Sequence, residues 1–266
     1  MSNLKITVVT VCYNAEKTIR KAIESVLEQQ YCNYEYIVVD GLSTDDTYNF
    51  VKSYDSAFRD KGIRYEHVSE KDTGIWNAMN KAIMMAKGEW IIFINADDKL
   101  HDDRVLSDVF YSNNYEEYDV IYGNVLRISN ETSFIGKANP VDIIKLNMPF
   151  CHQGSFTRAN ILKKYQFDEK FRVADYNFFL NLYLNGGKYY QIDRTIADYS
   201  TEGYSNQDKY KTYLGTVIVR DAHGLINKNS LKQKIKDYYF LQLLDEQQVF
   251  HKIISWVDSK FSRRKA

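Results

Sequence analysis

Short apolar segments alternate with helix-like segments over the first 125 residues, and this alternation limits the possible folds more than any other feature. The apolar segments, each the length of a strand, are 5–14, 34–40, 62–69, 89–95 and 119–125. The segments expected to be helices are 15–30, 43–54 and 74–88. Strands that alternate with helices form right-handed βαβ units. The sequence therefore predicts an α/β fold with a mostly parallel central sheet and helices on both faces.

Three residues mark the expected helix ends. Asn14 is an N-cap candidate for the first helix, and Ser43 is one for the second. Gly88 follows the third helix, where a C′ glycine is common.

The alternation fades after about residue 130, and we expect one domain over residues 1–208 and a helical extension over 209–266. From Lys228 to Ala266, nine Lys and Arg residues outnumber four acidic residues. An apolar stripe lies in the same segment and consists of Phe250, Ile253, Ile254, Val257 and Phe261. Two interpretations stay open: a basic amphipathic helix held at the cytoplasmic face of a membrane, or a stripe packed on protein with a solvated tail.

Charge and cysteine content narrow the class of protein. Lys and Arg together number 35, as do Asp and Glu, and this balance argues against a general nucleic-acid binder. The three cysteines are far apart and form no metal-binding pattern, which indicates a reducing compartment. The N-terminal residues do not resemble a signal peptide, and no apolar run approaches the ~20 residues of a membrane span. We therefore expect a cytoplasmic protein.

Polar residues follow four of the expected strands. They are Tyr13-Asn14, Asp40-Gly41, Glu70 to Asp72, and Asn95 to Asp98. Ligands of open α/β sheets bind at the carboxyl ends of the strands, so we expect these residues to meet at one edge. The glycine-rich GxGxxG and GxxxxGK[ST] loops, the GxSxG elbow and the HExxH motif are all absent. Dinucleotide oxidoreductases, P-loop enzymes and α/β-hydrolases therefore lose their main support.

Asp97 and Asp98 directly follow the buried segment 91–94, where two adjacent carboxylates repel each other. A hard divalent cation shared with a ligand's phosphates would compensate them. Alternatively, the pair caps the next helix, whose first turn would include Asp102 and Asp103. Asp40 likewise suits either a turn or a hydrogen bond to a nucleoside.

Four stretches together resemble the family 2 glycosyltransferases, which have the GT-A fold. They are VTVCYN, IVVDGLSTDDT, SEKDTGIWNAMNKAIMMAKGEWIIFINADD and ADYNFFL, and the resemblance spans about residues 5 to 205. It implies an inverting enzyme with a nucleotide-sugar donor and a divalent cation, Mn²⁺ or Mg²⁺. UDP is the expected nucleotide, with dTDP and GDP as alternatives. The implied acceptor is a saccharide, often lipid-linked, in bacterial cell-surface polysaccharide synthesis.

The resemblance also assigns residues to roles. Asp97 and Asp98 would hold the metal, with Asn95-Ala96-Asp97 as this chain's version of the DxD motif. The residues placed around the nucleotide and its diphosphate are Thr10, Asn14, Asp40, Gly41, Ser43, Asp72, Gly74, Lys81, Asn95, Ala96 and Asp97. Asn95, Asn77 and Asn177 stand where the family frequently has Asp, and Asn95 brings no negative charge to the metal.

Asp175 matches the family's catalytic base, since inversion needs one carboxylate to take the acceptor's proton. Its alternative role is the N-cap of the helix that follows. His152 and Gln153 resemble a stretch of bacterial polysaccharide transferases and are assigned to donor-sugar or acceptor contact, or else to structure. Residues 201–210 are either a loop over the diphosphate or an ordinary surface loop.

Two other functions are alternatives to a glycosyltransferase. The chain could be a catalytically weak nucleotide-sugar-binding scaffold of an assembly complex, which Asn95 favours and the three carboxylates Asp97, Asp98 and Asp175 disfavour. A nucleotidyltransferase would need a glycine-rich, basic loop after the first strand, and the sequence there is VCYNAEKTIRKA.

Overall fold

The structure is a computed structural model that describes residues 5–111, 113–201 and 209–226. The chain divides into two compact units between Gly203 and Tyr204, and each is described by itself. In the second unit the described element is helix α8 (Lys209–Ala222). The apolar stripe and the basic tail lie outside the described residues, as does most of the expected loop 201–210. No helix among the described residues is long and apolar enough to cross a membrane.

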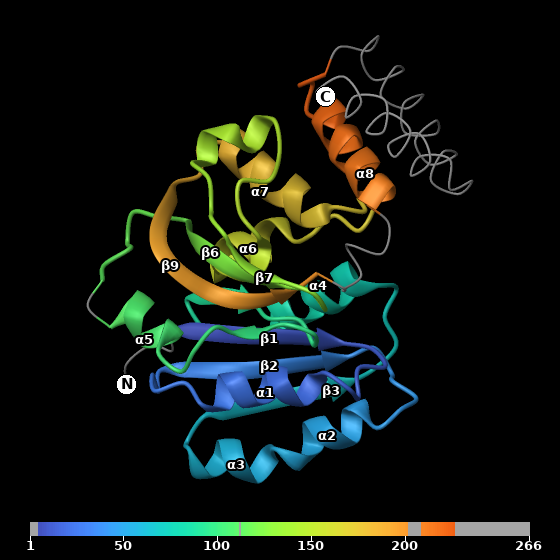
Figure 1. Ribbon diagram of the computed structural model, residues 1–266, viewed down its shortest axis with the longest axis vertical. Coiled ribbons are helices and arrows are strands. Elements are labelled where there is room, and N and C mark those ends of the chain that lie inside the picture. Colours follow the sequence, from blue (N-terminus) through green and yellow to red (C-terminus); the bar gives the residue numbers. More distant parts are fainter. Residues whose placement is uncertain (1–4, 112, 202–208, 227–266) are drawn as a thin grey trace, which may run out of the picture. The chain divides into compact units, whose positions relative to one another are not determined.

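The first half of the chain builds a parallel sheet (Figure 1). Its strands are β1 (Ile6–Cys12), β2 (Tyr34–Asp40), β3 (Arg64–Ser69) and β4 (Trp90–Phe93), in the order β3-β2-β1-β4. Its helices are α1 (Ile19–Leu27), α2 (Thr47–Ser53), α3 (Asp55–Asp60) and α4 (Ile75–Met85). Every strand and helix predicted here is present, and α3 is an additional short helix.

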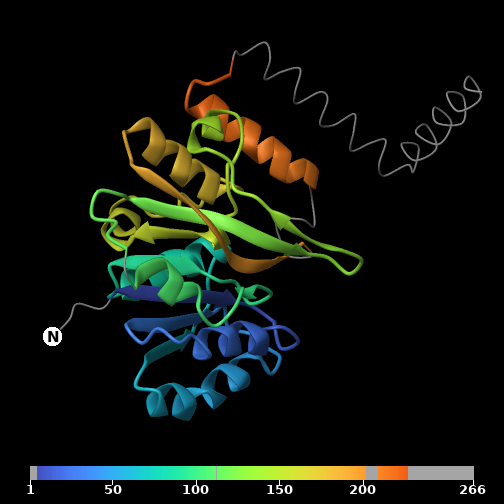
Figure 2. The same cartoon turned by 60° about the vertical axis from the view of Figure 1, so that its left-hand side comes forward.

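The second half continues the sheet with mixed pairing. Its elements are β5 (Lys99–Leu100), α5 (Val105–Phe110), β6 (Val120–Ile128), β7 (Ser133–Gly136), η1 (Val141–Lys145), η2 (His152–Gly154), β8 (Ser155–Arg158), α6 (Ala159–Tyr165), α7 (Ala174–Leu184) and β9 (Tyr189–Ser200). Strand β8 runs antiparallel to both β4 and β6, whereas β6 and β9 are parallel. Strand β7 folds back on β6 as a hairpin (Figure 2). The mostly parallel prediction therefore holds from β3 to β4, and the sheet is mixed beyond β4.

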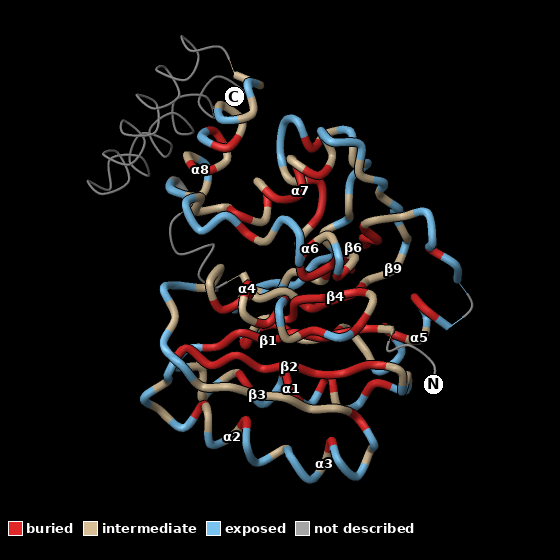
Figure 3. The backbone as a smooth tube through the Cα atoms, turned by 180° about the vertical axis from the view of Figure 1, so that it is seen from behind, coloured by how far each residue is buried: buried red, intermediate tan, exposed pale blue. Residues whose placement is uncertain are grey.

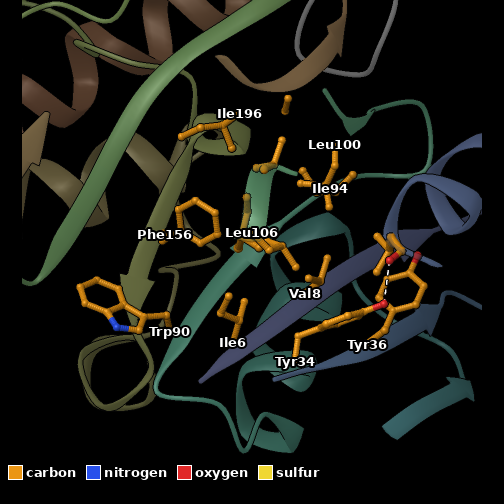
Figure 4. Packing of buried hydrophobic residues seen from close by; sticks show 14 of the residues in the cluster. Ile6, Val8, Tyr34, Tyr36, Trp90, Ile94, Leu100, Leu106, Phe156 and Ile196 are labelled. Atoms are coloured by element: carbon orange, nitrogen blue, oxygen red, sulfur yellow. Dashed lines mark hydrogen bonds between the residues drawn. The ribbon is translucent and has the colours of Figure 1, made fainter. Parts of the chain in front are cut away.

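The central strands are buried on both faces (Figure 3). Every residue of β1, β2 and β4 is buried. Ile6 and Val8 of β1 and Phe156 of β8 belong to one core cluster (Figure 4). Ile23 of α1 is part of the same cluster. Alternate strand residues point to the opposite face, where α4 packs on β1 and β2. This two-sided cover explains why these strands read as continuous apolar runs.

All three predicted helix-end roles are wrong. The N-cap of α1 is Thr18 rather than Asn14, and that of α2 is Asp46 rather than Ser43. Gly88 is not a C′ residue, since α4 ends in extended backbone at Ala86. A Cβ atom at Gly88 would lie 2.6 Å from the backbone of Ile6 and Thr7, so the glycine is needed for close contact with β1.

Glu35 is a fully buried carboxylate at the start of β2. It accepts hydrogen bonds from Thr7 Oγ1 (2.6 Å), Lys87 N (2.5 Å) and Gly88 N (3.0 Å), and it pairs with Arg64. One side chain thus joins β1, β2, β3 and the turn before β4.

We expect Glu35→Ala to lower the free energy of unfolding by about 3–5 kcal/mol, because it leaves three donors without their acceptor and removes the buried partner of Arg64. Urea denaturation measures this change. Glu66→Ala is the matched control, since Glu66 pairs with the same Arg64 but its side chain is 41% exposed, and it should cost about 1 kcal/mol or less. Equal losses in the two variants would contradict the central role of Glu35.

Candidate functional site

The register of the parallel strands brings four loops to one edge of the sheet. Cys12 pairs with Asp40, and Asp40 pairs with Ser69, so β1, β2 and β3 end at the same level. On the other side of β1, Val9 pairs with Phe93 at the end of β4. The polar residues that follow these strands therefore emerge together, as predicted from the sequence.

The loops after β1 and β2 hold each other. The backbone N of Asn14 donates to Ser43 Oγ (2.8 Å), and Asn14 Oδ1 accepts from the backbone N of Thr44 (2.9 Å). Asn14 has a positive φ of 49°, a conformation that Asn tolerates better than most residues. Asn14 and Ser43 thus shape the edge of the candidate site instead of capping helices.

Thr10 and Asp40 lie beneath this edge and are fully buried. Thr10 Oγ1 donates to the carbonyl of Ile94 (2.6 Å), directly before Asn95. The Asp40 carboxylate accepts from the backbone N of Ser43 (3.0 Å), from the Ser43 hydroxyl and from Ser69 Oγ (2.5 Å). In this structure the two side chains support the loops that carry the more exposed residues.

Gly41 permits a close approach of Asp72. A Cβ atom at position 41 would lie 2.6 Å from Asp72 Oδ2. The other oxygen of Asp72 accepts from the backbone N of Gly74 (2.9 Å), the residue before α4. Lys81 turns back to the same loop, where it bonds the carbonyl of Lys71 (2.8 Å) and pairs with Glu70 (2.9 Å).

The carboxylates of Asp97 and Asp98 have different surroundings. Asp97 is exposed, whereas Asp98 is only 2% exposed. Asp98 accepts from Gln153 Nε2 (2.9 Å) and from the backbone N of Ser200 (2.9 Å). Burial raises the pKa of Asp98 to about 8, and the adjacent Asp97 adds to the rise. Desolvation also raises the pKa of Asp97.

The helix-capping alternative for this pair has no support. Strand β5 separates Asp97 and Asp98 from α5, and the N-cap of α5 is Arg104. Ala96 is buried, and the side-chain oxygen of Asn95 is buried without a partner among the described residues. The pair therefore ends a buried strand with no positive charge bonded to either carboxylate in the described part of the chain.

The donor set fits a cation that is shared with a ligand. No cluster of three or more His, Cys, Asp and Glu side chains that could hold a metal exists within residues 5–111, 113–201 and 209–226. Mg²⁺ is usually held by one or two carboxylates together with substrate phosphates. The exposed Asp97, supported by the uncompensated Asp98, suits that kind of site.

Asp175 lies in the first turn of α7. The N-cap of this helix is Val173, and no side chain makes a capping hydrogen bond there. The predicted N-cap role of Asp175 is therefore wrong. Asp175 Oδ2 instead accepts from His152 Nδ1 (3.1 Å). The next residue, Gln153, is the one that bonds Asp98.

Glu169 is a site-proximal residue that the sequence did not reveal. It accepts from Thr73 Oγ1 (2.8 Å) and Asn77 Nδ2 (3.0 Å), and these hydrogen bonds lower the pKa of Glu169. Asn at position 77 can donate to Glu169, whereas an Asp there would repel it. Glu169 lies in a stretch without periodicity, so only the folded chain shows this pair.

Comparison with known proteins identifies the family. The family profile described as Glycosyl transferase family 2 matches residues 7–180, about two thirds of the chain. The chain belongs to glycosyl transferase family 2.

The chain is also similar to a curated relative and to two solved structures. A PGL/p-HBAD biosynthesis glycosyltransferase of Mycobacterium bovis is 27% identical over 175 residues, which are 65% of this chain and 67% of that protein. The structure of S. aureus TarS 1-349 in complex with UDP-GlcNAc matches with a TM-score of 0.61 and 22% identity, over 81% of this chain and 66% of that one. The mannosyltransferase PcManGT from Pyrobaculum calidifontis, in complex with GDP-Man and Mn²⁺, matches with a TM-score of 0.66 and 16% identity, over 84% and 65%.

These matches confirm the predicted GT-A fold. The chain spans slightly less than two thirds of each of these two solved chains. The roles of its individual site residues stay predictions.

The buried Asp98 should make this family 2 protein less stable as the pH rises. A carboxyl group whose folded pKa is above its unfolded value of about 4 binds its proton more tightly in the folded state. The free energy of unfolding therefore falls as the pH rises from about 4 to the folded pKa of about 8. Asp98→Asn removes this loss, so the variant should gain stability relative to the wild type as the pH rises.

Urea denaturation in EDTA at pH 4.5 and pH 8.5 measures the difference. Asp103→Asn is the control, because Asp103 is exposed and its variant should keep a constant difference from the wild type. A pH-independent difference for Asp98→Asn would contradict the expected titration.

Proposed function

We propose that the chain transfers a sugar, with inversion, from a nucleoside-diphosphate sugar to a saccharide acceptor. The observation that carries this proposal is the link between two carboxylate sites. Asp98, next to the exposed Asp97, is bonded to Gln153, and Asp175 is bonded to the adjacent His152. An inverting transfer needs these two functions close together: one group at the departing diphosphate and one base at the attacking hydroxyl.

The diphosphate side is assigned to the loops at the carboxyl ends of β1 to β4. We assign the nucleoside to the edge built by Asn14, Gly41 and Ser43, above the buried Thr10 and Asp40. Asp72, Gly74 and Lys81 extend this edge toward the diphosphate, at the N-terminal end of α4, where a helix favours negative charge. A divalent cation, Mn²⁺ or Mg²⁺, bound by Asp97 would stabilise the negative charge of the leaving group.

Asp175 is assigned as the base. Its side chain is 21% exposed and bonds His152 through Oδ2. The proton of the acceptor hydroxyl passes to this carboxylate as the oxygen attacks the anomeric carbon, while the bond to the nucleoside diphosphate breaks. One such displacement inverts the anomeric configuration.

The relatives support the proposed class of donor. TarS and PcManGT have been solved with UDP-GlcNAc and GDP-Man, which supports a nucleotide-sugar donor here, with UDP preferred and GDP as the alternative. A lipid-linked saccharide acceptor in bacterial cell-surface polysaccharide synthesis fits the family resemblance. Such an acceptor would place the protein at the cytoplasmic face of a membrane, reached through the basic segment 228–266, which lies outside the described residues.

A thermal-shift screen of nucleotide sugars with and without Mn²⁺ tests the donor assignment. A ligand that binds only the folded state raises its stability by mass action, so the correct donor should raise the melting temperature more when Mn²⁺ is present. No response to any UDP, dTDP or GDP sugar would overturn the proposed function. Nucleotide binding without any turnover would instead favour a scaffold subunit.

We expect Asp97→Ala to abolish the Mn²⁺-dependent part of nucleotide binding, because Asp97 is the exposed carboxylate at the end of β4. Calorimetric titration of UDP and GDP in MnCl₂ and in EDTA separates this part. Asp103→Ala changes another exposed carboxylate and should bind like the wild type. Unchanged affinity of Asp97→Ala in MnCl₂ would remove Asp97 from the metal site.

We expect Asp175→Asn to lower turnover by about 10²-fold or more, since the amide accepts a hydrogen bond but no proton. Donor affinity should barely change. The rate of nucleoside diphosphate release measures turnover, with Asp168→Asn, an exposed residue of the preceding loop, as the control. Near-normal turnover of Asp175→Asn would show that Asp175 is structural.

A further inference from the structure

Two adjacent side chains of the short turn η2 bond the two carboxylate sites described above. His152 Nδ1 lies 3.1 Å from Asp175 Oδ2, and Gln153 Nε2 lies 2.9 Å from Asp98 Oδ2. Asp98 and Asp175 are 77 positions apart in the sequence, yet neighbouring residues hold them. The turn is thus one structural element shared by both sites.

The turn is well supported. It contacts β4, β6 and β9, and Ser155 Oγ closes it by donating to the carbonyl of His152 (2.7 Å). The His152 ring lies near the rings of Trp76 and Phe93, with centroid distances of 6.3 and 6.5 Å. A side chain fixed by packing in this way holds its partner in one geometry.

Exposure shows which member of the His152–Asp175 pair can reach an acceptor. The His152 side chain is 10% exposed and its Nε2 atom is fully buried, whereas the Asp175 side chain is 21% exposed. His152 Nε2 also has no partner among the described residues. Nδ1 is therefore the ring nitrogen that bonds Asp175, and Nε2 is closed off from solvent.

Gln153 has a similarly fixed orientation. It is 3% exposed, and its Oε1 accepts from Cys151 Sγ while its Nε2 donates to Asp98. The other oxygen of Asp98 accepts from the backbone N of Ser200. Both carboxylate oxygens of Asp98 therefore accept a hydrogen bond. Because Asp97 is the preceding residue, these bonds also fix the backbone at Asp97.

We propose that His152 and Gln153 are positioning residues rather than contacts to the donor sugar or the acceptor. His152 orients Asp175 as the base, and Gln153 orients Asp98 and thereby Asp97. This assignment rests on the proposed function. The assignment predicts different effects for the two residues. Changes at His152 should lower turnover without weakening metal and nucleotide binding. Changes at Gln153 should weaken metal and nucleotide binding first.

The His152 test compares two variants. His152→Asn keeps an N–H donor at the position of Nδ1, and His152→Leu removes it. We expect His152→Leu to lower the kcat for nucleotide release from UDP-GlcNAc or GDP-mannose, with water as acceptor, by about tenfold or more, with KM unchanged. His152→Asn should recover most of the loss. His67→Leu and His67→Asn are matched controls, because His67 bonds a different carboxylate, Asp55 (3.0 Å).

A double-mutant cycle separates positioning from direct contact. If His152 acts only through Asp175, His152→Leu should have no further effect on kcat in the Asp175→Asn background. A further loss there, or a rise in KM for His152→Leu alone, would overturn the role of His152 and indicate contact with a substrate.

The Gln153 test uses Gln153→Met, which keeps the volume and removes the donor. We expect the MnCl₂ concentration needed for half-maximal UDP or GDP binding, measured by calorimetry, to rise about 10- to 100-fold. His152→Leu should leave this concentration unchanged. A Gln153→Met variant that binds Mn²⁺ and nucleotide like the wild type would overturn the role of Gln153.

One measurement needs no turnover and separates this inference from the proposed function. The ¹⁵N NMR signals of the His152 ring should report a proton on Nδ1, and Asp175→Ala should shift them. A ring that carries its proton on Nε2 and not on Nδ1, or signals unaffected by Asp175→Ala, would overturn the pair even in an active enzyme. If the signals behave as expected but the wild type binds no nucleotide, the proposed function fails while the Asp175–His152 pair stands.

Discussion

The buried carboxylate of Asp98 joins the two halves of the sheet domain. It follows β4, the last strand of the parallel part, and its two oxygens accept from Gln153 and from the backbone of Ser200, 55 and 102 residues further along the chain. Burying an uncompensated carboxylate is unfavourable, and the raised pKa of Asp98 records that cost. The mixed half of the sheet therefore has to supply donors at this point, and it does so from η2 and from the end of β9.

A second constraint comes from the parallel strands themselves. Because β1, β2 and β3 are in register at Cys12, Asp40 and Ser69, the loops after them begin at one level. Buried bonds then fix the loops: Asp40 holds Ser43, and Thr10 holds the backbone next to Asn95. Buried polar residues therefore support the loops that carry the exposed groups of the site. Such support keeps donors and carboxylates oriented before a ligand arrives.

The sequence predicted correctly those features that depend on local pattern. The strands of the parallel half lie where the apolar runs predicted them, and the four polar loops meet at one edge as the rule for α/β sheets requires. The helix-end predictions were wrong because other contacts decided those residues. Asn14 serves the loop after β2, and Gly88 is a glycine because β1 passes 2.6 Å from where its Cβ would be.

By itself, the sequence determined the α/β class, the family and the residue types available for chemistry, because these depend on local periodicity and on motif order. Only the tertiary structure decided which carboxylate is exposed and which is buried, since Asp97 and Asp98 are neighbours with the same side chain. It also decided that His152 meets Asp175 and that Gln153 meets Asp98. No spacing in the chain encodes those pairs, because they depend on how β8, α7 and β9 pack around the end of β4.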